Sequence, residues 1–184
     1  NNGGPYAAIK HVYYKRQAGA LTDNSFWTSG ITANNYTFIR FADLLLWAAE
    51  CEVEVGSLAN AVTYVNQVRN RVKSNPASWV KMPGGANAAN YQVGLYTSFP
   101  DQTYGRKAVR FERKLELASE GHRFFDLVRY GIADVELNAY IAKEKAKRTY
   151  FVNAVFTKGK SEYFPIPQSQ IDLSKGVLKQ NPGY

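Results

Sequence analysis

The sequence predicts a mainly α-helical fold of helical hairpins with long irregular loops and a small C-terminal β-hairpin. Three observations predict this class. Apolar residues recur at helical spacing in four stretches, and very short connections join these stretches in pairs. A segment rich in Pro, Gly and Asn separates the two pairs, and two β-rich runs follow residue 148. A chain of 184 residues can bury one core.

The first part of the chain, residues 1–36, is predicted to be coil. Asn, Gly, Thr and aromatic residues dominate it, and no helical period is present. The opening residues Asn1-Asn2-Gly3-Gly4-Pro5 are typical of the middle of a loop. We therefore expect the chain to be a piece of a longer or processed protein.

A first helical hairpin is predicted over residues 37–72. One helix covers 37–55, and its apolar residues form a wide face suited to burial on more than one side. Gly56 ends this helix and Ser57 caps the second, which covers 58–72. Because the connection is about two residues long, the two helices must run antiparallel.

A second helical hairpin is predicted over residues 107–148, after an irregular insertion over 74–105. The insertion is punctuated by Pro and Gly, and loops of this length in compact domains are often functional. The hairpin consists of a helix from 107 to 130, a connection at Gly131, and a helix from 132 to 148.

Residues 150–184 are predicted to form the β-hairpin and an irregular tail. The runs 150–156 and 161–166 are rich in β-branched and aromatic residues, and residues 157–160 have the composition of a turn. Prolines at the end of the second run stop the strand.

Two helical hairpins about 70 residues apart suggest repeated stacking, so we compared the first with the tetratricopeptide pattern. Five residues fit its small and large positions: Leu45, Ala49, Ala61, Val65 and Val68. The characteristic proline is missing, and the tryptophan and tyrosine positions do not match. The residues alone therefore match the tetratricopeptide pattern only in part.

The formal charge of +8 raises the question of nucleic-acid binding. The excess lies mostly in residues 106–160, where 13 basic residues alternate with 7 acidic ones. The densest basic cluster is Lys143, Lys145, Lys147 and Arg148. A nucleic-acid site needs base-stacking or groove-reading side chains beside such a cluster, and we expect a solvated face and no nucleic-acid partner.

The sequence indicates no cofactor, no metal site and no catalytic residues. One cysteine, Cys51, excludes an intrachain disulfide and a cysteine-based zinc site. His11 and His122 are too isolated to predict a metal centre, and we expect a hydrogen-bonding role for His122. Neither a phosphate-binding glycine loop nor a nucleophile elbow is present.

Three carboxylates, Glu112, Glu116 and Glu120, share one face of the helix over 107–130. A glycosidase would need two carboxylates across a cleft, so an ion-pairing role is the better prediction. Partners within reach on the same helix are Arg110, Arg113, Lys114 and Arg123. Arg40 and Asp43 on the first helix are predicted to tie helices together.

The aromatic content of 14% has two interpretations. Rings can fill a core, or they can stack on the flat faces of ligands such as sugars. Trp27 and Trp79 lie in polar loop segments that suit sugar binding, and the alternative is that each ring anchors its loop to the core. We select Trp27, Trp79 and Tyr96 as candidate ligand-binding residues.

Several motifs in order resemble a known family. They are FIRFADLLLWAAECEVEVG with ANAVTYVNQVRNRV, then RFERKLELASEGHRFFDLVRYG, then YFPIPQSQI and LKQNPGY. Together they resemble the C-terminal part of the SusD/RagB family of outer-membrane lipoproteins. The resemblance covers about residues 36–75, 107–131 and 161–184. Positions that we take to be structural in the family are matched by Arg40, Asp43, Glu120, Arg123 and Asp126.

The resemblance implies an α-helical fold built on tetratricopeptide-like helical hairpins. It also implies a cell-surface binding protein and not an enzyme. Such proteins lie on the extracellular face of the outer membrane, bind glycans or other nutrients, and cap a SusC-like TonB-dependent transporter. It implies lipid anchoring through an upstream segment, because Cys51 is predicted to lie within a helix. It also implies that the N-terminal part of the same protein packs on this one. The alternative is a structural or protein-interaction helical-repeat module without its own ligand site.

Overall fold

The computed structural model describes residues 8–25, 27 and 31–184. The chain divides into two compact units, residues 1–121 and 122–184, and each is described by itself. Both are mainly helical, which confirms the predicted class. None of the helices in the described residues is both long and apolar enough to cross a membrane.

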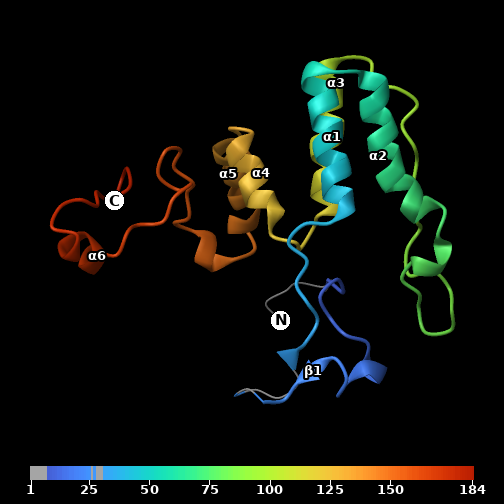
Figure 1. The fold of residues 1–184 in the computed structure, drawn as a ribbon, viewed down its shortest axis with the longest axis horizontal. Coiled ribbons are helices and arrows are strands. Elements are labelled where there is room, and N and C mark those ends of the chain that lie inside the picture. The colour runs from blue at the N-terminus through green and yellow to red at the C-terminus, as the bar shows by residue number, and fades with distance from the viewer. Residues whose placement is uncertain (1–7, 26, 28–30) are drawn as a thin grey trace. The chain divides into compact units, whose positions relative to one another are not determined.

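Three helices form the centre of the first unit: α1 (Phe41–Val55), α2 (Leu58–Lys73) and α3 (Gln102–Glu116). Figure 1 shows α1 and α2 side by side and antiparallel, and α3 packs against both. The tight connection is stabilised by Glu52, whose carboxylate accepts a hydrogen bond of 2.7 Å from the Ser57 backbone N–H. The predicted second helix is one residue shorter than α2, and α1 begins four residues later than predicted.

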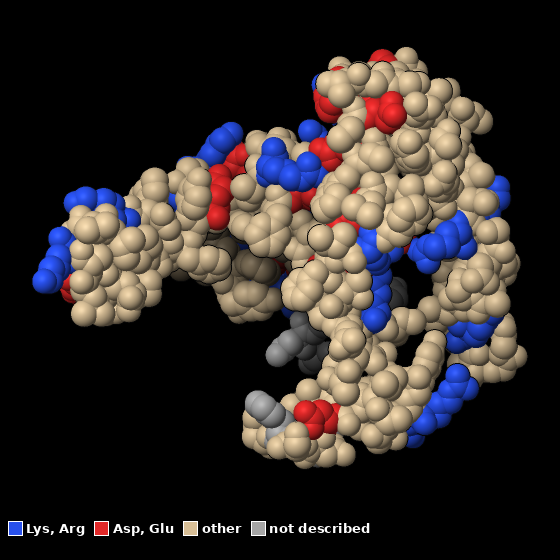
Figure 2. Space-filling view, in the orientation of Figure 1, with Lys and Arg blue, Asp and Glu red and all other residues tan. Residues whose placement is uncertain are grey.

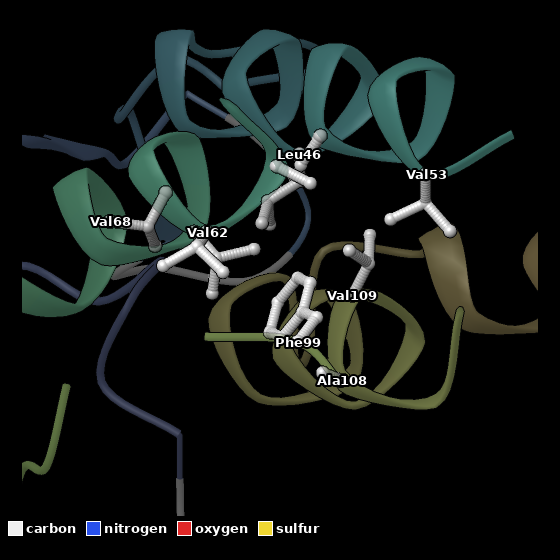
Figure 3. Packing of buried hydrophobic residues seen from close by; sticks show 10 residues of the cluster. Leu46, Val53, Val62, Val68, Phe99, Ala108 and Val109 are labelled. Atoms are coloured by element: carbon white, nitrogen blue, oxygen red, sulfur yellow. The ribbon is translucent and has the colours of Figure 1, made fainter. Parts of the chain in front are cut away.

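The core of this unit lies between the three helices. Gly105 allows their close approach, because a Cβ there would lie 3.1 Å from Val53 and 3.3 Å from Phe99. Figure 3 shows the apolar side chains converging on this space. The cluster consists of Leu46, Ala49, Val53, Ala61, Val62, Val65, Val68, Phe99, Ala108 and Val109. The helical stripe of each element thus faces the core, as amphipathic periodicity requires.

An irregular excursion connects α2 to α3. It contains a 3₁₀ turn at Pro76–Ser78 and an isolated antiparallel bridge between Lys81 and Asn87. The excursion ends at Asp101, whose side chain accepts a 2.7 Å hydrogen bond from the Tyr104 N–H and caps α3. This cap explains why α3 begins five residues before the predicted start.

The prediction of a single helix over 107–130 is wrong, because α3 ends at Glu116 and a second helix begins at His122. A turn separates α3 from α4 (His122–Arg129), and Ser119 and Gly121 adopt positive φ angles of 66° and 82°. The Glu116 carbonyl, which would otherwise continue the helix, accepts hydrogen bonds of 2.6 Å from Lys10 and from Arg40. Contacts with distant residues therefore end α3 at Glu116, although the apolar spacing of the sequence continues past it.

The N-terminal segment carries a 3₁₀ turn at Lys15–Gln17 and a two-stranded antiparallel sheet. Strand β1 (Thr22–Asp23) pairs with β2 (Ile31–Thr32), with Thr22 opposite Thr32 and Asp23 opposite Ile31. Trp27 lies on the connection between the two strands.

In the second unit, α4 is followed by α5 (Ala133–Lys145), a 3₁₀ turn at Thr149–Phe151 and α6 (Gln168–Leu173). The turn between α4 and α5 includes Gly131 at a φ of 69°. The helical pair thus spans 122–145, where we predicted a hairpin over 107–148.

The predicted C-terminal β-hairpin is also wrong, because residues 150–184 contain no strand. The side-chain amide of Asn138 on α5 bonds both the N–H and the carbonyl of Phe156, at 2.8 and 2.9 Å. Gln180 bonds both backbone groups of Ile166 in the same way, at 2.8 and 2.9 Å. These side chains satisfy the backbone groups that a β-ladder would have used.

Candidate functional site

The ring of Trp27 is the most accessible of the three aromatic rings that the sequence singles out. Its residue is 88% exposed on the loop between β1 and β2. Just before it, the Asp23 carboxylate accepts hydrogen bonds from the Ser25 N–H at 2.8 Å and from the Ser25 hydroxyl at 2.5 Å. These bonds lower the pKa of Asp23 and turn the chain next to the tryptophan. An indole placed in this way can receive a flat ligand face.

Trp79 lies at the start of the excursion and is mostly covered. Its indole N–H donates a 2.9 Å hydrogen bond to the Val72 carbonyl at the end of α2. Its ring lies 5.0 Å, centre to centre, from the ring of Tyr91. These contacts anchor the excursion to α2 and leave part of the ring system accessible.

Tyr96 is held at the other end of the excursion. Asn66 on α2 bonds both its N–H and its carbonyl, at 2.9 and 2.8 Å. Its ring meets Phe99 edge-on at 5.2 Å, and the Arg69 guanidinium lies 5.2 Å from the ring centre. Burial raises the pKa of the phenol. A cavity of about 240 Å³ adjoins this residue, lined by Arg69, Gly94, Leu95 and Tyr96.

The three candidates do not form one platform. Trp79 and Tyr96 share the excursion along α2, whereas Trp27 belongs to the β1–β2 loop. Within the described part of the chain, no ring contact joins Trp27 to either of the others.

The three glutamates of the shared helix face form ion pairs with residues from other segments. Glu112 pairs with Arg69 at 2.6 Å. Glu116 pairs with Arg40 at 2.5 Å and with Arg71 at 2.8 Å. We predicted partners on the same helix, and the correction is that α1 and α2 supply these cations instead. The spacing of the glutamates in sequence predicted a shared helix face, but it did not indicate which other segments contact that face.

Glu120 and the buried pair of Asp43 and Arg113 complete this network. Arg40 Nε and Lys10 Nζ donate to the Glu120 carboxylate at 2.7 and 2.5 Å. Burial acts to raise the pKa of Glu120, but the bonds from the two cations outweigh it and lower the pKa to about 2. Asp43 and Arg113 meet at 2.7 Å and are 0% and 2% exposed. Arg40 and Asp43 thus tie α1 to α3 and its C-terminal turn, as predicted.

A polar cavity of about 270 Å³ lies over this network within the first unit. Its walls come from the N-terminal segment, the residues before α1, and the C-terminal ends of α2 and α3. The lining residues are Lys10, His11, Asn35, Thr37, Arg40, Arg71, Glu116 and Glu120. Sequence reasoning missed this site. The glutamate spacing marked one wall, while Lys10, His11 and Asn35 carry no local pattern.

Charge elsewhere is dispersed. On the face drawn in Figure 2, Lys and Arg form several separate patches, with Asp and Glu beside some of them. Among the described residues, no group of three or more His, Cys, Asp or Glu side chains is arranged to hold a metal ion.

Comparison with known proteins places the chain among SusD-like sequences. A model of the SusD family matches residues 1–184. SusD-like protein P25 of Formosa agariphila is 40% identical over 160 residues, which cover 83% of this chain and 25% of that protein. SusD-like protein P2 of the same organism is 28% identical over 173 residues, covering 93% and 29%. The chain thus spans about a quarter of the length of these curated relatives.

Solved structures agree. A SusD homologue from Bacteroides thetaiotaomicron superposes with a TM-score of 0.60 at 35% identity, covering 87% of this chain and 30% of that one. Surface glycan-binding protein A from the same organism superposes with a TM-score of 0.54 at 26% identity, covering 83% and 26%.

Proposed function

The chain belongs to the SusD family, and from this premise we propose that it is part of a cell-surface protein that binds glycans without cleaving them. The observation that carries the proposal is the similarity to surface glycan-binding protein A in both sequence and fold. In this proposal the protein lies on the outer membrane, is tethered through an upstream lipidated segment, and delivers glycan to a SusC-like TonB-dependent transporter. The N-terminal part of the same protein packs on the residues described above.

The accessible aromatic rings support binding by stacking. Trp27 presents almost its whole side chain, so a pyranose face can pack on the indole while Asn and Ser groups bond the hydroxyls. Trp79 and Tyr96 are proposed as secondary contacts through the accessible parts of their rings, because each also anchors the excursion.

The carboxylates of α3 and its C-terminal turn support a binding protein over a glycosidase. Hydrolysis of a glycosidic bond needs two carboxyl groups facing each other across the bond, with at least one free to give a proton. Here Glu112 and Glu116 lie on α3, and Glu120 lies in the turn that follows it. Each accepts hydrogen bonds from Arg or Lys side chains. Burial raises the pKa of Glu112, whereas the bonds from Arg40 and Lys10 outweigh burial at Glu120 and lower its pKa to about 2.

Titration calorimetry on the full-length chain tests the proposal. The probes are cellohexaose, xylohexaose, maltohexaose, mannohexaose and hexagalacturonic acid. We expect at least one to bind, and Trp27→Ala to weaken that binding about tenfold, because stacking on an exposed indole contributes on the order of 1 kcal/mol. Val55→Ala, at a comparably exposed apolar residue, is the control and should leave the affinity unchanged. No binding to any probe, or steady release of shorter sugars, would contradict the proposal.

A protein-interaction module without a ligand site is the second candidate, favoured by an apolar face on α1. Phe41 and Leu44 on this helix are 71% and 48% exposed, and Val55 is 91% exposed. Exposed apolar residues at this spacing suit a partner helix. If the full-length chain binds no probe but Phe41→Ser releases it from its transporter in a co-purification, this function replaces glycan binding.

A further inference from the structure

The polar cavity holds hydrogen-bonding groups that the fold itself does not use. Asn35 and Thr37 both line it. Neither the Asn35 amide nor the Thr37 hydroxyl has a partner within the part of the chain that the structure describes. Together they offer three donor hydrogens, two on the amide nitrogen and one on the hydroxyl, and two acceptor oxygens in one wall. The groups that support the fold are elsewhere in the cavity, so these two are available to a ligand.

The backbone that carries these groups is restrained by contacts between rings, although Tyr36 and Phe38 are 45% and 76% exposed. Polar and aromatic residues alternate along this wall. Asn35 and Thr37 line the cavity, whereas Tyr36 and Phe38 do not. The Tyr36 ring stacks on His11 at 4.8 Å, and Phe38 meets Tyr36 edge-on at 5.2 Å. His11 in turn contacts the Ser119 carbonyl through Nε2 at 3.1 Å. Aromatic packing thus pre-organises the wall, which lowers the entropy cost of binding.

The charges in the cavity favour a neutral ligand. Three cations and two carboxylates line it. Arg40 and Lys10 are engaged by the two glutamates, whereas Arg71 is 62% exposed and donates to Glu116 through Nη2. The remaining N–H groups of Arg71 can bond a hydroxyl oxygen, and the carboxylates can accept from a hydroxyl hydrogen. All three cations already form ion pairs with these two carboxylates, so none of them is left without a partner to attract an acidic sugar.

The size of the cavity limits what it can hold. Its volume of about 270 Å³ lies just below the range of roughly 300–1,000 Å³ that is usual for small-molecule sites. We propose that this cavity binds one neutral sugar residue of the glycan through its hydroxyl groups, with Asn35, Thr37 and Arg71 as the recognising side chains. The inference rests on the proposed function and adds a second, polar contact point to the aromatic ones.

The test uses the full-length chain, the tightest-binding hexasaccharide of the panel above, and the disaccharide of the same linkage. Asn35→Ala combined with Thr37→Val should weaken binding of both probes by about tenfold, since each lost hydrogen bond accounts for a few-fold. The loss should be similar for the two lengths, because a site for one residue is filled equally by either. Hexagalacturonic acid should bind at least tenfold more weakly than the best neutral probe.

The matched control is Asn153→Ala combined with Thr149→Val, an exposed pair in the second unit, which should bind like the wild type. Circular dichroism melts of both double variants check that folding is retained. Wild-type affinity in the Asn35/Thr37 variant would overturn the cavity site while leaving the proposed function intact, especially if Trp27→Ala still loses binding. Preference for hexagalacturonic acid would overturn the neutral-sugar assignment, and failure of every probe would overturn both proposals.

Discussion

The two units of the chain hold themselves together differently. In the first, the described residues include eleven buried apolar residues and four buried charged ones. These charged residues form ion pairs with residues from other segments or helices. In the second, the described residues include two buried apolar residues, Leu127 and Ala133, and one buried charged residue, Asp126. Its irregular segments are instead held by amide side chains, such as Asn138 and Gln180, that bond backbone groups from a distance in sequence.

The difference shows that different interactions stabilise the two units. The first unit buries helical stripes, so its stability rests on apolar area, and each of its buried charges needs its partner to stay in place. The second unit has little apolar area to bury, and a few side-chain-to-backbone hydrogen bonds determine the path of its chain. Substitutions should therefore act through different physical terms in the two units.

The largest expected effect is the loss of the buried ion pair of the first unit. Arg113→Met leaves the Asp43 carboxylate without its 2.7 Å partner, and we expect the full-length chain to lose about 3–5 kcal/mol of stability. Asp43→Asn combined with Arg113→Met should recover much of the loss, since no charge then stays buried. Urea unfolding followed by circular dichroism measures both.

The control for this pair is Arg106→Met, which removes a surface pair with Glu54 whose side chains are both 38% exposed. It should cost far less stability than Arg113→Met, because water screens an exposed ion pair. Equal costs for Arg106→Met and Arg113→Met would show that burial does not distinguish the ion pairs of this unit.

A smaller effect is expected from acid. Because the pKa of Glu120 is lowered from its ordinary 4.5 to about 2, the stabilisation by Arg40 and Lys10 is complete above about pH 5 and is lost as the pH falls toward 2. At neutral pH, Glu120→Gln should cost up to about 3 kcal/mol, and the difference from wild type should vanish near pH 2. Thermal melts from pH 7 to 2 measure this. Glu136→Gln, at an exposed pair, should show no such pH dependence, and a similar curve for both would refute the assignment.

The smallest effect should be confined to the second unit. Asn138→Ala removes the two bonds to Phe156, and we expect a local loss of about 1–3 kcal/mol. Hydrogen exchange should rise in peptides from residues 150–166 and stay unchanged in α1 and α2. Asn153→Ala, at an exposed asparagine of the same unit, is the control. Faster exchange in α1 would show that the two units do not differ in the way described.

Much of the helical architecture could be predicted because periodicity reports burial directly. The end of α1 and the start of α2 lie at Val55 and Leu58, as predicted, since Gly56 and Ser57 are local stop and start residues. The interruption after Glu116 could not be predicted. The cations that bind its carbonyl, Lys10 and Arg40, are 106 and 76 residues away in sequence.

The candidate site divides in the same way. Composition and loop context pointed to Trp27, and the structure leaves that ring exposed. They also pointed to Trp79, but the hydrogen bond to Val72 that anchors it follows from how the excursion folds back on α2. The polar cavity joins four separate stretches of chain, so no local motif could mark it.

By itself, the sequence determined the mainly helical class, the first helical pair and the family, because these depend on local spacing and on contiguous motifs. The tertiary structure alone decided which cations meet the three glutamates, where the third helix ends, and that Asn138 and Gln180 replace a β-ladder. The physical reason is range. Helical periodicity acts over a few residues, whereas an ion pair or an amide-to-backbone bond forms between residues that only the folded chain brings together.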